Sequence, residues 1–216
     1  MAEIFLMIDL TSFGRVVSLS ILASCVCFAT AEAAEIYTNF PPDGSCAITF
    51  YGDIEQGDEN LFDILTPDCR GGGVLFKSNG GHLLAGLRIG ELIRQKGLET
   101  AVSYDATCAS ACALAWLGGT KRYMFMDSLI GFHAAYIADG GEARESGVAN
   151  ALVGAYLTNL GLSVETVIFA TSAKPEQMNW LNYPSAKDIG IEAVLLTDAD
   201  RAWIDSLDST ALSPTN

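Results

Sequence analysis

The fold class of this chain follows from residues 73–97, GVLFKSNGGHLLAGLRIGELIRQKG. The apolar run from Gly73 to Phe76 predicts a short strand that is covered on both faces of a sheet. A turn with two adjacent glycines, Gly80 and Gly81, leads directly into a predicted helix, whose apolar residues recur every three or four positions until Gly97. A buried strand that runs straight into an amphipathic helix is typical of an α/β domain with a parallel sheet.

The same alternation continues on both sides of this stretch. Further strands are predicted at residues 47–54, 100–104, 123–126, 129–134 and 191–196, and helices at residues 59–65, 108–117, 143–160, 164–173 and 184–189. Residues 35–45 are expected to form an extended leading segment, and residues 197–216 an acidic surface helix with a frayed end. We therefore expect one α/β domain over residues 34–196, with a mostly parallel sheet and flanking helices.

The amino-acid composition argues against a disordered chain and against nucleic acids as binding partners. Half of the 216 residues are hydrophobic and 18% are charged, which excludes a wholly disordered chain. Twelve basic residues against 26 acidic ones give a net charge of -14, and such a surface repels the phosphates of nucleic acids. Only two histidines are present, so any chemistry that needs histidine must use His82 or His133.

The first 33 residues have the pattern of an export signal. An uncharged apolar run at residues 16–30 is followed by Ala31-Glu32-Ala33, the spacing of small residues that a signal peptidase reads. We expect a cleavable signal peptide over residues 1–33 and a periplasmic or secreted protein, with Met7 as an alternative start. Leu22 to Cys25 also matches a lipoprotein box, in which Cys25 would be lipidated, and an uncleaved anchor is a third interpretation.

Three short segments carry residues suited to catalysis. The Gly80-Gly81 turn presents free backbone amides at a helix N-terminus, where developing negative charge is favoured. In residues 107–112, TCASAC, small neighbours leave the Ser110 hydroxyl accessible, and the Ala111 amide points the same way. His133 lies in an apolar strand. Each segment alone fits an ordinary turn, a packing serine or a core histidine, whereas their order in one chain favours a catalytic site.

Together the three segments resemble the Clp protease proteolytic subunit and its wider superfamily, which also contains the crotonases. Ser78-Asn79-Gly80-Gly81 stands where that family has Ser-Pro-Gly-Gly, Cys108 to Ala111 falls on its nucleophile segment, and Gly131-Phe132-His133 falls on its catalytic histidine. The resemblance covers about Ile48 to Leu196 and implies a ClpP/crotonase-like fold. The Cys-Ala-Ser-Ala-Cys version is similar to a group of exported bacterial proteins.

This resemblance implies a role for each site residue. Ser110 would be the nucleophile and His133 the general base and later the general acid. The backbone amides of Gly81, which follows Gly80 in the turn, and of Ala111 would form the oxyanion hole. The resemblance implies a peptide or protein substrate and no metal or cofactor. Relatives assemble into rings or trimers, so the oligomeric state stays open, with a homo-oligomer as one alternative.

The sequence departs from the family at several positions. Asn79 replaces the family's proline, and His82 replaces a small residue and is expected to pack at the helix N-terminus. The third catalytic member, an aspartate in the family, aligns with Met178, so the adjacent Asn179 is the candidate for this role. Lys77 is a weaker alternative base, as in the serine–lysine relatives of the superfamily.

Three functions therefore stay open at the level of sequence. The favoured one is an exported serine hydrolase, a peptidase that acts through a Ser110 acyl-enzyme. The second is a catalytically inactive scaffold or binding module that keeps the same fold. Crotonase-type chemistry on a thioester is a weaker third.

Four of the six cysteines lie beyond the predicted signal peptide. Cys46 and Cys69 precede the first two strands, and if these strands are parallel neighbours both cysteines lie at one end of the sheet, within disulfide reach. We therefore favour a Cys46–Cys69 disulfide. Cys108 and Cys112 are four positions apart, on one face of the helix predicted at residues 108–117, and either bond to each other or stay buried as thiols. A metal site is not expected, because only His82 or His133 could complete one.

Overall fold

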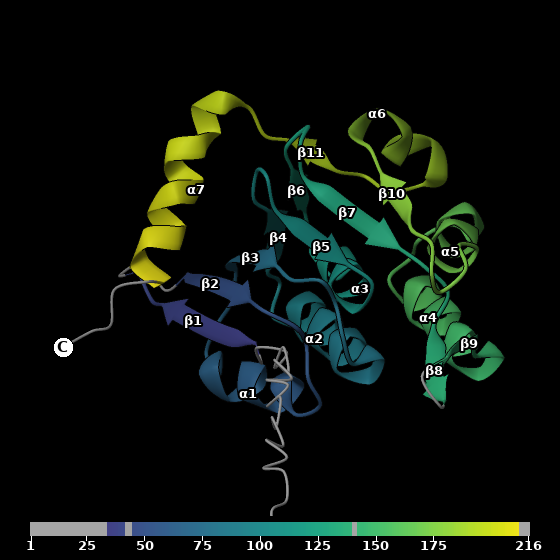
Figure 1. Cartoon of the computed structure of the whole chain (residues 1–216). Coiled ribbons are helices and arrows are strands. Elements are labelled where there is room, and N and C mark those ends of the chain that lie inside the picture. Colours follow the sequence, from purple (N-terminus) through teal and green to yellow (C-terminus); the bar gives the residue numbers. More distant parts are fainter. Residues whose placement is uncertain (1–33, 42–44, 140–141, 212–216) are drawn as a thin grey trace, which may run out of the picture. The chain divides into compact units, whose positions relative to one another are not determined.

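A six-stranded sheet forms the centre of the fold in residues 34–41, 45–139 and 142–211, which are the residues that the computed structural model describes (Figure 1). Its strands lie in the order β1 (Glu35–Asn39), β2 (Cys46–Tyr51), β3 (Gly72–Lys77), β4 (Glu99–Val102), β6 (Arg122–Met124) and β11 (Val194–Leu195). Only β1 is antiparallel to its neighbour, and the other pairs are parallel. The predicted mostly parallel sheet is therefore confirmed.

A second, three-stranded sheet lies beside the end of β3. It has the order β10 (Asn179–Leu181), β7 (Leu129–Phe132) and β5 (Thr107–Ala109), with β5 parallel and β10 antiparallel to β7. The Ser78 amide donates to the carbonyl of Thr107 at 2.8 Å, and the amide of Ala109 donates back to the Ser78 carbonyl at 3.1 Å. These bonds hold the turn after β3 against β5, and therefore bring the first two candidate segments together.

Seven α-helices are present in the described part of the chain, and two of them pack closely beside the candidate site. They are α1 (Asp58–Leu65), α2 (Leu83–Gln95), α3 (Ala111–Leu117), α4 (Gly147–Asn159), α5 (Val164–Thr171), α6 (Tyr183–Ala186) and α7 (Asp198–Ala211). A Cβ on Gly86 of α2 would lie 2.7 Å from the carbonyl oxygen of Ala111, and one on Gly118 would collide with Gly90. Glycine at these contacts lets α2 and α3 approach at backbone distance.

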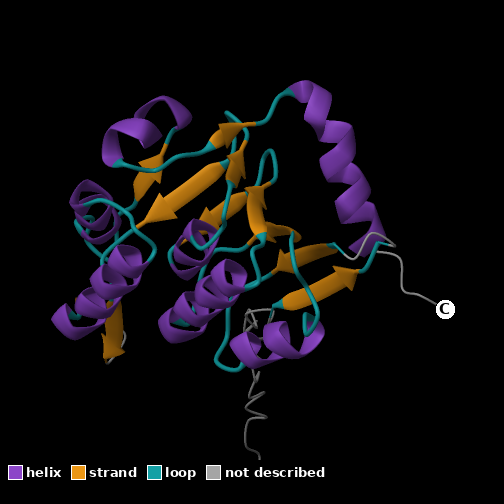
Figure 2. Ribbon diagram, turned by 180° about the vertical axis from the view of Figure 1, so that it is seen from behind, coloured by secondary structure: helices purple, strands orange, loops and turns teal. Residues whose placement is uncertain are grey.

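The two faces of the main sheet are covered by different helices. Alternate residues of a strand point to opposite faces, so Val74 and Phe76 of β3 enter the larger core, whereas Leu75 enters a smaller one with Ile204 of α7. Figure 2 shows α7 apart from the other helices. The expected C-terminal helix is thus present and packs Ile204 onto the sheet, while residues 212–216 and the predicted signal peptide lie outside the described residues.

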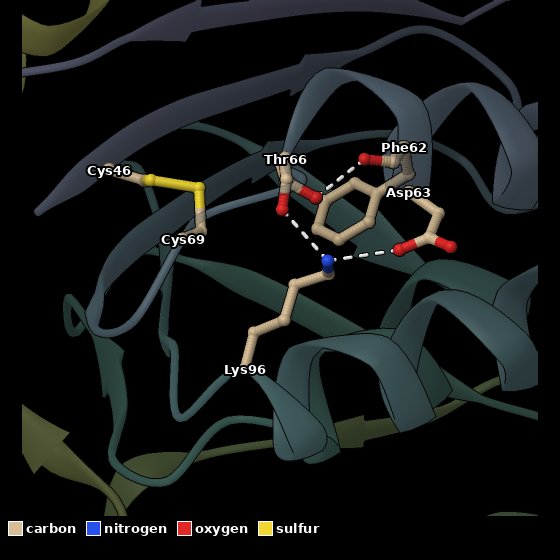
Figure 3. The surroundings of a disulfide bond; sticks show 6 residues. All are labelled: Cys46, Phe62, Asp63, Thr66, Cys69 and Lys96. Carbon is tan, nitrogen blue, oxygen red and sulfur yellow. Dashed lines mark hydrogen bonds and ion pairs between the residues drawn. A yellow bond between two sulfur atoms is a disulfide. The ribbon is translucent and has the colours of Figure 1, made fainter.

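The Cys46–Cys69 disulfide forms as predicted, with the two Cα atoms 5.6 Å apart (Figure 3). It joins the start of β2 to the loop after α1. The same loop is held by Lys96, whose ammonium group donates to the Thr66 carbonyl at 2.7 Å and pairs with the Asp63 carboxylate at 2.9 Å.

None of the helices in the described ranges is both long and apolar enough to cross a membrane.

The structure corrects several predicted element boundaries. The helix predicted at residues 108–117 begins only at Ala111, because residues 107–109 form β5 and pair with β7. The predicted helix at residues 143–160 begins at Gly147, since β9 (Glu142–Glu145) forms a hairpin with β8 (Tyr136–Asp139). The leading segment contains β1, and β10 was not predicted.

Candidate functional site

Ser110 lies in the tight turn between β5 and α3. Its backbone has φ 54° and ψ -122°, and it is one of two non-glycine residues with positive φ among the described residues. Its amide donates to the carbonyl of Gly131 at 2.8 Å. Its hydroxyl makes no hydrogen bond to the described residues and does not cap α3. A serine held in a strained turn with a free hydroxyl is arranged like a nucleophile rather than like a helix cap.

The Ser110 side chain borders a pocket of about 420 Å³ that also contains His133. The walls present polar and apolar surface in about equal parts, and His82 and His133 are the bases that line it. The lining residues are Asn79, Gly81, His82, Leu83, Leu84, Ser110, Leu114, Phe132, His133, Ala135, Tyr136, Ala138, Val153 and Ala170. The structure thus brings the three candidate segments of the sequence to one pocket.

The Gly80-Gly81 turn lies directly against Ser110 and requires glycine at both positions. Gly80 has φ +107°, and a Cβ there would lie 2.7 Å from the Ser110 Cβ and 3.1 Å from the Ala111 nitrogen. Gly81 has φ +130°, and a Cβ there would collide with the Ile54 carbonyl. Because only glycine tolerates these contacts, the backbone of the turn can approach the nucleophile closely.

Two backbone amides beside Ser110 are free to bind an oxyanion. The bridge between Ile54 and the turn uses the Gly80 carbonyl and the His82 amide, at 2.6 Å and 2.7 Å, which leaves the Gly81 amide unpaired within the described structure. The Ala111 amide, at the first position of α3, likewise has no acceptor among the described residues. Free amides next to a nucleophile are the donors that an oxyanion hole needs.

His133 follows β7 and is half-buried at the pocket wall. Its Nδ1 lies 2.8 Å from the carbonyl oxygen of Ala134. Since a carbonyl oxygen only accepts, this bond places a proton on Nδ1 and leaves the Nε2 lone pair of the neutral ring free. No hydrogen bond joins His133 to Ser110 in the described structure. The ring is tilted against Tyr136, with the centroids 5.5 Å apart.

Asn179 is placed next to the histidine but is bound elsewhere. It pairs in register with Phe132, one residue before His133. Its Nδ2 donates to the Phe169 carbonyl at 2.8 Å and to the Ser172 hydroxyl at 3.0 Å. No hydrogen bond between Asn179 and His133 is found in the described part of the chain, so its role as third catalytic member stays a prediction.

The Ala134 carbonyl is the group next to His133 that sequence reasoning missed. A backbone carbonyl has no sequence signal, because every residue carries one. The segment that presents it is held by two hydrogen bonds: the Ala134 amide donates to Ala173 and the Ala135 amide donates to Asn150, both at 2.8 Å. These contacts come from residues far along the chain, which only folding brings together.

The other candidate bases have structural contacts. His82 is the N-cap of α2, and its Nδ1 accepts from the Ala85 amide at 3.2 Å, as the expected helix-terminus position requires. Lys77 does not line the Ser110 pocket, and its ammonium group lies 5.2 Å from the centroid of the Tyr51 ring. The described residues contain no cluster of His, Cys, Asp and Glu that could hold a metal ion.

Tyr156 ties α4 to the helix that begins at the nucleophile. Its hydroxyl donates to the Leu114 carbonyl at 2.9 Å. Burial raises the pKa of this hydroxyl, so it stays protonated and keeps donating over the ordinary pH range.

A fully buried disulfide between Cys108 and Cys112 spans the Ser110 turn, with Cα atoms 5.2 Å apart. Of the two alternatives that the sequence left open for this pair, a disulfide or two buried thiols, the structure has the disulfide.

Comparison with known proteins identifies the fold through solved structures. No protein-family model matches the sequence, and no curated protein matches it. A membrane-bound stomatin-specific protease, 1510-N, with a serine replaced by alanine, superposes with a TM-score of 0.56 at 17% identity, over 73% of this chain and 82% of that one. The same protease with a lysine replaced by alanine, in complex with a substrate peptide, gives 0.54 at 18% identity, over 73% and 77%. A ClpP1 variant from Listeria monocytogenes gives 0.45 at 18% identity, over 71% and 92%. The chain therefore has the α/β fold of the stomatin-specific protease.

Proposed function

We propose that this protein is a serine hydrolase that cleaves peptides through an acyl-enzyme on Ser110. The observation that carries the proposal is the convergence of the unpaired Ser110 hydroxyl, His133 with a free Nε2 and the unpaired Gly81 amide at one pocket, with the unpaired Ala111 amide following Ser110 in the chain. These are the nucleophile, the base and the oxyanion donors of acyl transfer. A pocket with both polar and apolar walls, next to free backbone amides, suits a peptide, and a protease of the same fold has been solved with a substrate peptide.

The chemical steps use only groups of this chain. The Ser110 hydroxyl attacks the peptide carbonyl while His133 Nε2 accepts its proton, and the Gly81 and Ala111 amides donate to the oxyanion. His133 then returns the proton to the leaving amine, and a water molecule, activated by the same histidine, hydrolyses the acyl-enzyme. These steps require a hydrogen bond between Ser110 and His133. Catalytic hydrogen bonds of this kind often tighten only when substrate binds.

The Ala134 carbonyl takes the orienting part of the third catalytic member in this mechanism. It selects the correct tautomer of His133, as a carboxylate would, but carries only a partial charge. It therefore stabilises the imidazolium less than a carboxylate does. We expect the protein to turn over more slowly than a hydrolase with a complete Ser-His-Asp triad.

The proposed place of action is the periplasm or the exterior. Two disulfides support this, because such bonds persist in oxidising compartments. The alternative is a lipoprotein that is attached to a membrane through a lipidated Cys25.

Self-association also stays a prediction. The apolar side chains of Val148 and Val164, on α4 and α5, are largely exposed and are candidates for a contact between copies.

Labelling with a fluorophosphonate tests the proposed function. Purified, oxidised protein should label at one site, and the label should disappear in Ser110→Ala and His133→Ala. Ser185→Ala, in α6 and outside the pocket, is the matched serine control and should label like the native protein. Mass spectrometry of peptide digests should then show new termini with native protein and Ser185→Ala, but not with Ser110→Ala or His133→Ala. If folded native protein neither labels nor cleaves peptides, the protein is a binding module with this fold.

A further inference from the structure

The Cys108–Cys112 disulfide encloses the proposed nucleophile. The two cysteines are four positions apart, so the covalent ring contains the backbone of Ala109, Ser110 and Ala111. It therefore includes both the attacking hydroxyl and one of the two oxyanion donors. A bond that crosses this turn constrains the two catalytic groups directly.

The backbone inside the ring is strained. Ser110 holds a positive φ that side chains rarely adopt, and such a conformation persists only where the surrounding structure enforces it. Hydrogen bonds enforce it in part, since the Ser110 amide donates to Gly131 and its carbonyl accepts from Leu114 at 3.1 Å. The Ser110 side chain contributes no hydrogen bond of its own.

The disulfide links two well-anchored elements across this turn. Cys108 belongs to β5, where it pairs with Ile130 of β7 and bridges to Ser78 after β3. Cys112 lies in the first turn of α3, which packs on α2 through Gly86. Both cysteines have no exposed surface, so an external thiol reduces this bond slowly and only after the surrounding structure opens locally.

The second disulfide provides a control within the same chain. Cys46 pairs with Gly72 at the first residue of β3, whereas the catalytic turn follows the last residue, Lys77. At about 3.3 Å per residue the two ends of β3 are about 17 Å apart. The Cys46–Cys69 disulfide thus lies away from the pocket, and it closes the longer loop, 23 residues against 4.

From this arrangement we propose that Cys108 and Cys112 are positioning residues, whose disulfide holds Ser110 and the Ala111 amide in the conformation that reacts. This inference rests on the proposed function. It makes the site dependent on oxidation: a dithiol reductant supplies two electrons and two protons, the S–S bond breaks into two thiols, and the reductant becomes a disulfide. The turn can then relax, and the hydroxyl and the amide no longer face the same substrate atom.

The test compares two double variants, Cys108→Ala/Cys112→Ala and Cys46→Ala/Cys69→Ala. The first should react with a fluorophosphonate about 100-fold more slowly, since misplacement by about 1 Å has such an effect, and its kcat should fall far more than its KM changes. The second should label within about threefold of the native rate. It should lose more thermal stability, because it opens the longer loop.

Hydrogen exchange gives a readout that does not depend on activity. Amides of residues 107–114 should exchange faster in Cys108→Ala/Cys112→Ala and at the native rate in Cys46→Ala/Cys69→Ala. If native protein never labels, the proposed function fails, while this measurement still decides whether the disulfide restrains the turn. Native-like exchange and native-like labelling in the first variant would overturn the inference, and so would equal losses of labelling in both variants.

Reversible reduction covers the case in which the first variant does not fold. In Cys46→Ala/Cys69→Ala the Cys108–Cys112 disulfide is the one left among the described residues, and its reduction is followed by counting the free thiols gained after alkylation. Labelling should fall about 100-fold as two thiols appear and return on reoxidation. Unchanged labelling of the reduced, folded protein would overturn the inference.

Discussion

Replacing Ser110 by glycine should stabilise the fold relative to replacing it by alanine. Both variants lack the hydroxyl, which makes no hydrogen bond in the described structure, so the comparison isolates the backbone. A non-glycine residue at φ 54° and ψ -122° costs about 1–3 kcal/mol, and glycine tolerates positive φ without strain. Against this, glycine loses up to about 1 kcal/mol through its greater freedom in the unfolded chain. The net expectation is that Ser110→Gly is about 1 kcal/mol more stable than Ser110→Ala.

Urea unfolding of the two variants measures this difference. For a domain of this size 1 kcal/mol corresponds to about 2–4 °C in Tm, so calorimetry provides a second estimate. Ser185→Gly against Ser185→Ala is the control, because Ser185 lies in helix α6 and glycine there should be less stable than alanine. If Ser110→Gly is no more stable than Ser110→Ala, the turn is unstrained and the reasoning about the nucleophile's backbone is refuted.

Three further outcomes follow from the same structure. Removing the Cys46–Cys69 disulfide, whose cysteines are 23 residues apart, should lower the free energy of unfolding by about 3.4 kcal/mol, measured by urea titration of the double alanine variant; a loss below about 1 kcal/mol would contradict the loop-entropy account. Gly80→Ala should reduce fluorophosphonate labelling at least about 100-fold, because its Cβ would meet the nucleophile's turn. Gly97→Ala, also at positive φ but with open space around it, should label normally, and equal labelling of the two variants would refute the steric argument. His82→Ala should cost about 1 kcal/mol of stability through the lost α2 cap, whereas His82→Asn should keep most of that stability, as thermal melts would show. Equal melting temperatures of the native protein and His82→Ala would contradict the role of His82 as a helix cap.

The local sequence was sufficient to predict a helix or strand where that element carries its own pattern of apolar residues. The apolar periodicity after Gly81 predicted the helix that forms as Leu83–Gln95, and the preceding apolar run predicted β3. The Cys46–Cys69 pairing was also predictable, because two parallel neighbouring strands place the residues that precede them at the same sheet end. In each case the reason is geometric and involves few residues.

Periodicity failed where a segment is buried on every side. From Ala111 to Leu117 each residue is buried, so no polar face marks the helix, and nothing in the composition separates it from Cys108 and Ala109 of β5. Residues 107–109 form strand β5 because they pair with β7, where the partner of Cys108 is Ile130, more than 20 residues away. Strand β10 was missed for the same reason, since its partner β7 lies far earlier in the chain. Strands β8 and β9 were missed although they are neighbours in one hairpin.

Residue types and their spacings were enough to predict the α/β class, the glycine turn and the serine and histidine that share a pocket. The positive φ of Ser110, the bonding of Cys108 to Cys112 and the contacts of Asn179 and His133 depend on the folded structure. The Ala134 carbonyl beside His133 belongs to the backbone, which is the same at every position. Its place beside the histidine depends on packing between distant segments, and no local pattern records that.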